Sequence, residues 1–125
     1  MATQLMDIVL PRLAKRLYGK VQRYRAGELN DKQFASHFAS LLQKQYVWLA
    51  RRGVSETDAA LAIHAAVLVL TRPGLCAAAT EMGMPAELVE AKAIRNAAAD
   101  MAEHYSVDVN EAFDMLSDIV VRYGT

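Results

Sequence analysis

The 125-residue sequence is poor in several residue types that support common chemistries. It has one cysteine, three prolines and only 7% aromatic residues. The single Cys76 excludes an internal disulfide and lacks the paired spacing of a zinc site, which favours a reduced, cytoplasmic setting. The sequence also lacks a glycine-rich phosphate loop and a nucleophile elbow. We therefore predict a protein that is not an enzyme.

Metal ligands and membrane segments are also sparse. His37, His64 and His104 show no Glu-x-x-His or His-x-x-x-His spacing, so we expect no metal and no other cofactor, and His64 is expected to be a core histidine with one hydrogen bond. The longest apolar stretch, Ala59 to Leu70, is short for a bilayer and predicts no transmembrane segment. Basic residues follow the apolar ones at the start of the chain, unlike in a signal peptide.

The sequence is rich in features that favour helices. Alanine occurs 22 times, apolar residues recur at helical spacing, and no stretch shows sustained strand alternation. The pattern predicts an all-α fold, a compact bundle of five to six helices forming one domain over 1–125, with a central apolar helix near 56–71. The predicted helices begin near Thr3, Asn30, Ser55, Gly74, Pro85 and Asp108.

Local signals set several helix boundaries. Asn30 with Gln33 forms a capping box, and Asp108 with Glu111 forms a similar pair. The stretch Thr71 to Gly74, which contains Pro73, predicts a break followed by a short helix up to Met82. Pro11 indicates either a kink in the first helix or a fresh helix start, and the sequence leaves both open.

Charge is unevenly distributed along the chain although its formal sum is zero. Residues 1–72 carry eleven Lys/Arg and five Asp/Glu, whereas residues 73–125 carry three and nine. The two halves are therefore net +6 and −6. Such a separation is either neutralised when the halves pack together or used to attract partners of opposite sign.

A ladder of basic residues lies on one face of the first predicted helix. It consists of Arg12, Arg16, Lys20 and Arg23, and no acidic residue occurs between Asp7 and Glu28. Like charges at these spacings repel by about 0.2–0.5 kcal/mol per pair. The ladder could be solvated or paired within the chain, could bind an acidic protein or a second copy, or could contact phosphates of nucleic acid or lipid.

Candidate partners for the ladder lie in the second half of the chain. Glu87 and Glu90 share one side of their predicted helix, and we expect them to meet Arg12 or Arg16 within one chain or across a dimer. Trp48 lies in an aromatic-rich second helix and could anchor an interface. The leading prediction is a protein-protein interaction module, an adaptor, inhibitor or assembly subunit, that forms a homo-oligomer through basic N-terminal and acidic C-terminal faces.

The alternative function is a nucleic-acid-binding regulator. The stretch Cys76 to Lys92 resembles a helix-turn-helix, with Ala79, Gly83 and Val89 at the small, turn and aliphatic positions. However, the second helix of this hairpin carries Glu87 and Glu90 near its start and no Arg, Lys, Asn or Gln over 86–91. Carboxylates repel phosphate, so nucleic acid is the less favoured partner.

Overall fold

The computed structural model describes residues 2–124 and is all-α over that range. Its five helices are α1 (Ala2–Arg25), α2 (Asp31–Arg51), α3 (Glu56–Glu81), α4 (Ala86–His104) and α5 (Val109–Tyr123). The predicted all-α bundle of five to six helices is thereby confirmed. The chain divides into two compact units, Met1–Ile63 and His64–Thr125.

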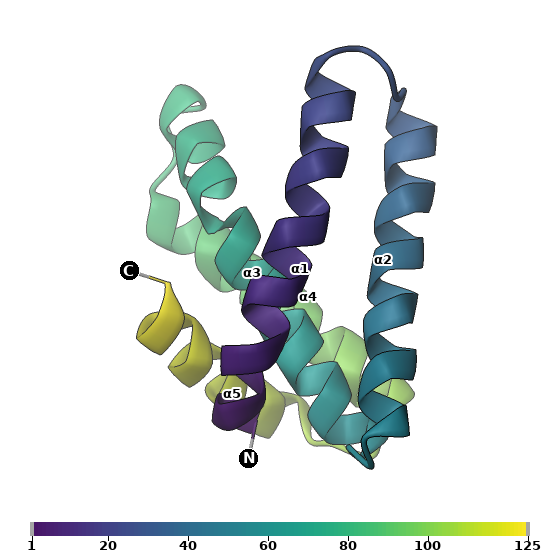
Figure 1. Cartoon of the computed structure of the whole chain (residues 1–125). Coiled ribbons are helices and arrows are strands. Elements are labelled where there is room, and N and C mark those ends of the chain that lie inside the picture. Colours follow the sequence, from purple (N-terminus) through teal and green to yellow (C-terminus); the bar gives the residue numbers. More distant parts are fainter. Residues whose placement is uncertain (1, 125) are drawn as a thin grey trace. The chain divides into compact units, whose positions relative to one another are not determined.

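The first unit is built on a hairpin of α1 and α2, which lie side by side and are joined by a short turn (Figure 1). Gly27 allows this turn because its φ of 79° is a left-handed conformation that glycine adopts without steric cost. The buried face of α1 includes Met6, Val9 and Leu13, each fully buried. Pro11 lies inside α1, so it does not start a new helix.

The start of α2 follows the sequence signal closely. Asn30 accepts a hydrogen bond from the Gln33 backbone N–H at 2.8 Å, and the Gln33 side chain accepts from the Asn30 backbone N–H at 3.0 Å. This reciprocal pair satisfies two N–H groups that a helix end otherwise leaves unpaired. At the other end Gly53, with φ 79°, follows the C-cap Arg52.

The predicted break at Thr71 to Gly74 is wrong, because α3 continues through Pro73 to Glu81. A proline inside a helix removes one backbone donor and strains the preceding turn, at a cost of about 3 kcal/mol. The flanking sequence is rich in alanine and leucine, which favour helix over many residues. The Thr71 hydroxyl also donates to the Val67 carbonyl at 2.8 Å within this segment. The two helices predicted on either side of the break are therefore one.

The apolar helix predicted near 56–71 is the N-terminal part of α3. The residues of its 59–66 stretch are at most 5% exposed apart from His64, which is half-buried. Over 2–124, α3 alone is long and apolar enough to cross a membrane, a test that buried core helices also pass. The structure therefore gives no clear transmembrane segment.

The second unit contains the rest of α3 together with α4 and α5, and α4 packs on α5. Its buried side chains include Ile94 and Met101 of α4 and Leu116 and Val120 of α5. The N-cap of α5 is Asp108, whose carboxylate accepts from two backbone N–H groups at 3.1 and 3.2 Å. This cap was predicted from the sequence.

Candidate functional site: the basic face of the α1–α2 hairpin

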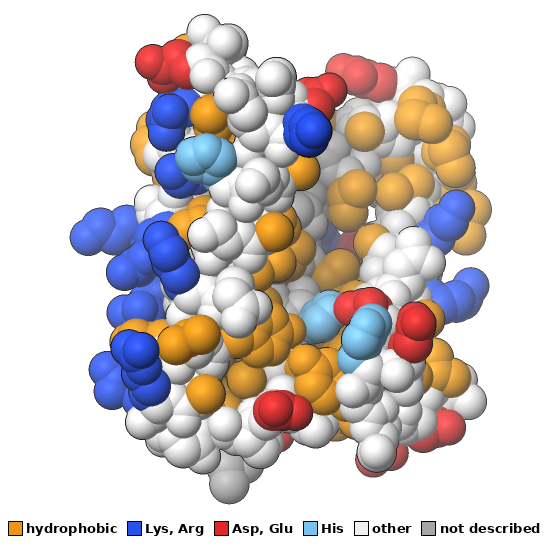
Figure 2. Space-filling model, turned by 90° about the vertical axis from the view of Figure 1, so that its right-hand side faces the viewer, with side chains coloured by type: hydrophobic (Ala, Val, Ile, Leu, Met, Phe, Trp, Pro, Cys, Tyr) orange, Lys and Arg blue, Asp and Glu red, His pale blue; other side chains and the backbone are white. Residues whose placement is uncertain are grey.

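The basic ladder lies along α1 as the sequence predicts, and Figure 2 shows Lys and Arg side chains gathered in a column along one edge of the molecule. Arg16 and Arg23 are exposed, while Arg12 and Lys20 are half-buried. None of the four forms an ion pair with a carboxylate among the described residues of the first unit, 2–63. The repulsion between them is therefore not offset by an ion pair within that unit.

Residues of α2 extend this surface, which we call the basic face: the four ladder residues together with Lys44, Arg51 and Arg52. The α2 residues recur at i, i+7 and i+8, which places them on one side of the helix. All three are exposed. The ladder predicted from the sequence does not include them, because the sequence alone does not show that α2 lies beside α1.

Trp48 lies within the basic face and contacts two of its cations. The Arg12 guanidinium carbon is 3.9 Å from the Trp48 ring centroid, and that of Arg52 is 4.0 Å away. Each is a cation–π contact, in which the ring quadrupole attracts the positive charge. Trp48 is half-buried, and its predicted role as an interface anchor stays a prediction.

Gln45 fixes Arg12 from the α2 side. Its side-chain oxygen accepts a hydrogen bond from Arg12 Nε at 3.3 Å, and Gln45 is only 1% exposed. The pKa of Arg12 is lowered, first because the group is partly removed from water and then by the charges of Arg16 and Arg52. Arg12 therefore lies close to two other cations, and the Gln45 oxygen and the Trp48 ring hold it there.

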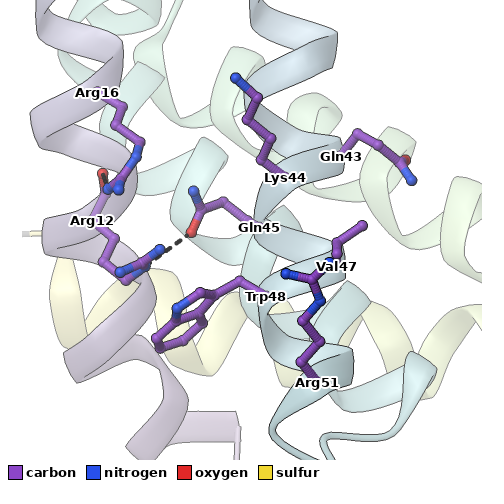
Figure 3. A pocket seen from close by; sticks show the side chains of 8 residues that line it. All are labelled: Arg12, Arg16, Gln43, Lys44, Gln45, Val47, Trp48 and Arg51. Carbon is purple, nitrogen blue, oxygen red and sulfur yellow. Dashed lines mark hydrogen bonds between the residues drawn. The ribbon is translucent and has the colours of Figure 1, made fainter.

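A pocket of about 390 Å³ opens beside these residues (Figure 3). It lies between α1 and α2, and four cations contribute to its wall. Lining side chains are Arg12, Arg16, Gln43, Lys44, Gln45, Val47, Trp48 and Arg51. No carboxylate lines it. The pocket was not predicted, because it exists only once α1 and α2 are paired.

The far end of the basic face surrounds His37. Burial lowers the pKa of His37, and the charges of Lys20 and Arg23 lower it further. An anion bound beside Lys20 and Arg23 would therefore raise the pKa of His37.

The predicted acidic residues lie in the second unit. Glu87 is exposed, and Glu90 is half-buried and forms an ion pair with Arg72 through Arg72 Nε and Glu90 Oε2 at 3.3 Å. Arg72 also donates to the Gly124 carbonyl, so it links α3, α4 and the end of α5. Glu90 thus has a cationic partner in its own unit, and its predicted pairing with Arg12 or Arg16 stays a prediction.

A separate acidic surface lies on α5 and consists of Glu111, Asp114 and Asp118. All three are exposed, and none forms an ion pair with a Lys, Arg or His among the described residues of the second unit, 64–124. Their spacing of three and four residues aligns them on one side of the helix. We call this surface the acidic face.

The second unit also holds a small titratable cluster. His64 Nε2 is 2.9 Å from Asp100 Oδ2, and His104 Nδ1 lies 3.0 Å from the Asp100 carbonyl oxygen. Asp100, Glu103 and His104 offer ligand atoms within 4.8 Å of one another, but all three are exposed. The contacts of His64 and His104 with Asp100 are enough to explain why these side chains lie together.

The helix-turn-helix-like hairpin at 76–92 has the expected turn. Ala79 is 1% exposed, Gly83 has φ 69°, and α4 begins two residues beyond Met84. Cys76 is half-buried and Glu87 is exposed in the first turn of α4. The glycine turn is present, while the side chains at the start of α4 include the exposed carboxylate of Glu87, and the predicted role of the hairpin in nucleic-acid binding stays a prediction.

The chain matches no protein-family model, no curated protein and no solved structure. The function is therefore inferred from the residues of the basic face and of the acidic face and from their contacts.

Proposed function

We propose that this protein is a non-enzymatic interaction module that binds an acidic protein surface through its basic face. The observation that carries the proposal is the lack of ion-pair partners for Arg12, Arg16, Lys20 and Arg23 among the described residues of their own unit, 2–63. Bringing like charges together without counter-charges costs free energy in the isolated molecule. An acidic partner would offset that cost and gain from complementary potentials.

A second copy of the chain is the first candidate for the partner. The acidic face on α5 carries three exposed carboxylates that also lack ion-pair partners among the described residues of their own unit, 64–124. Residues 1–63 hold ten Lys/Arg and five Asp/Glu, and residues 64–125 hold four and nine. The units are thus net +5 and −5, so one copy offers the charge that the other lacks.

Charge reversal tests this pairing. We expect Arg16→Glu and Asp114→Lys each to weaken self-association, measured by light scattering and sedimentation at low salt, and the two variants mixed together to restore it. Lys92→Glu is the matched control, since Lys92 is exposed and lies outside both faces. A wild-type chain that stays monomeric at high concentration and low salt would exclude the second copy as partner.

Nucleic acid is the second candidate partner, favoured by the turn geometry of the 76–92 hairpin and by the cations of the basic face. Exposed Glu87 at the start of α4 opposes groove binding. Binding of duplex DNA that weakens steeply with salt and disappears when the four ladder residues are neutralised would favour this alternative.

A further inference from the structure

The pocket beside Trp48 is rich in hydrogen-bond donors and poor in acceptors. Arg12, Arg16, Lys44 and Arg51 can only donate. Gln45 has one acceptor oxygen, and Arg12 Nε already uses it. Because Arg12 Nε can only donate, the Gln45 amide must present its oxygen to Arg12 and its NH₂ group elsewhere. Figure 3 shows that amide nitrogen directed away from Arg12, on the side of Arg16 and Lys44.

The position of Gln45 makes this arrangement a preformed one. Gln45 is almost completely buried, so its amide cannot rotate freely into solvent. Arg12 is held between Gln45 and the Trp48 ring. The Arg12 guanidinium and the Gln45 amide are therefore held in place before any ligand arrives, which lowers the entropy lost on binding for this part of the wall.

The charge of the pocket selects the class of ligand. Four cations line it, whereas a ligand with one carboxylate group would bring only a single negative charge. A phosphate monoester carries a charge of about −1.5 to −2 and three acceptor oxygens at neutral pH. Guanidinium groups match phosphate oxygens through paired N–H donors. A phosphate thus meets both the charge and the donor arrangement better than a carboxylate does.

Two apolar side chains and Gln43 complete the wall of the pocket. Val47 is 38% exposed and, with Trp48, borders the cationic side chains. The volume of about 390 Å³ falls within the range of roughly 300–1,000 Å³ typical of small-molecule sites. There is consequently space for a small organic group attached to the phosphate.

We propose that this pocket binds the phosphate group of a small soluble phosphorylated compound, with Arg16, Lys44 and Arg51 contacting its oxygens and Val47 and Trp48 contacting its organic part. Arg12 and Gln45 position the cationic wall. The proposal involves the same face as the interaction proposed above but stands without it. A bound phosphate would neutralise part of the basic face and compete with an acidic protein partner.

Trp48 makes the proposal directly testable because it is the only tryptophan in the sequence. Phenyl phosphate, pyrophosphate and inorganic phosphate are titrated into the full chain at constant ionic strength, with chloride as reference, while Trp48 fluorescence is recorded. We expect a saturable change with phenyl phosphate and pyrophosphate. The double variant Arg16→Gln and Arg51→Gln should weaken binding at least about tenfold, since it removes two charge-assisted contacts. Lys92→Gln should leave it unchanged.

Two further measurements separate the possible outcomes. Circular dichroism of each variant establishes that it is folded, and light scattering in the same samples reports self-association, so phosphate binding and protein binding can fail independently. Responses to phosphates equal to the response to chloride would overturn the inference. It would also be overturned if only anionic vesicles or single-stranded DNA bound in an Arg16-dependent manner.

Discussion

Replacing Arg16 with glutamine should stabilise the protein while weakening its binding to an acidic partner. Arg16 is exposed, and it has Arg12 four residues before it and Lys20 four residues after it. The substitution relieves two like-charge pairs of about 0.2–0.5 kcal/mol each, a gain of about 0.4–1 kcal/mol in the free energy of unfolding. For a chain of this length that corresponds to an increase of about 2–4 °C in Tm. The one hydrogen bond lost, from Arg16 Nη1 to the Arg12 carbonyl at 3.3 Å, is exposed and contributes little.

The dependence of this stability difference on salt concentration tests the prediction. The Debye length falls from about 10 Å at 0.1 M salt to about 3 Å at 1 M, so the difference between Arg16→Gln and wild type should vanish at high salt. Urea unfolding at both salt concentrations measures it. Arg122→Gln is the matched control, because Arg122 lies in the last turn of α5, four residues after Asp118, and should destabilise slightly. The reasoning is refuted if Arg16→Gln lowers the stability at low salt.

Three other perturbations follow from individual contacts. Arg72→Gln should lower the unfolding free energy by about 1–3 kcal/mol in thermal melts, because it leaves half-buried Glu90 without its cationic partner; an effect as small as that of an exposed surface change would contradict this. Asn30→Ala should cost about 1 kcal/mol in urea unfolding by removing the capping box, and an unchanged midpoint would count against the cap. The pKa of His104 is raised, first by its hydrogen bond to the Asp100 carbonyl and then by the Asp100 carboxylate. Protonated His104 therefore stabilises the fold below its unfolded pKa of about 6.5, and this stabilisation is lost as the pH rises through the raised pKa. NMR titration should show Asp100→Asn lowering that pKa.

The parts of the fold that could be predicted from the sequence are those set by neighbouring residues. Asn30 and Gln33 are three positions apart, so their capping box can be recognised without knowing any other part of the chain. Pro73 shows the limit of that reasoning. Its local effect is to disfavour a helix, but the helix-forming residues on both sides extend α3 to Glu81.

The candidate site likewise has one part that depends on a single helix and another that depends on two helices meeting. The ladder on α1 depends on spacing within one helix, and its four residues do lie in a single helix, while their predicted role in binding stays a prediction. The pocket requires Arg12 and Arg16 from α1 to meet Gln45 and Trp48 from α2, so no pattern within either helix contains it. A buried glutamine between Leu41 and Leu49 was the available signal, since a polar residue at a core position needs a specific partner.

On both faces, we expect a charge substitution to change the stability of the chain and its affinity for a partner in opposite directions. On the basic face, each cation removed relieves repulsion in the isolated chain but removes attraction for an acidic partner. The same holds for Glu111, Asp114 and Asp118 on the acidic face with a basic partner. A surface that was merely solvated would show the first effect without the second. Measuring stability and association on the same set of charge variants therefore distinguishes a binding surface from a solvated one, because only a binding surface makes the two quantities change in opposite directions.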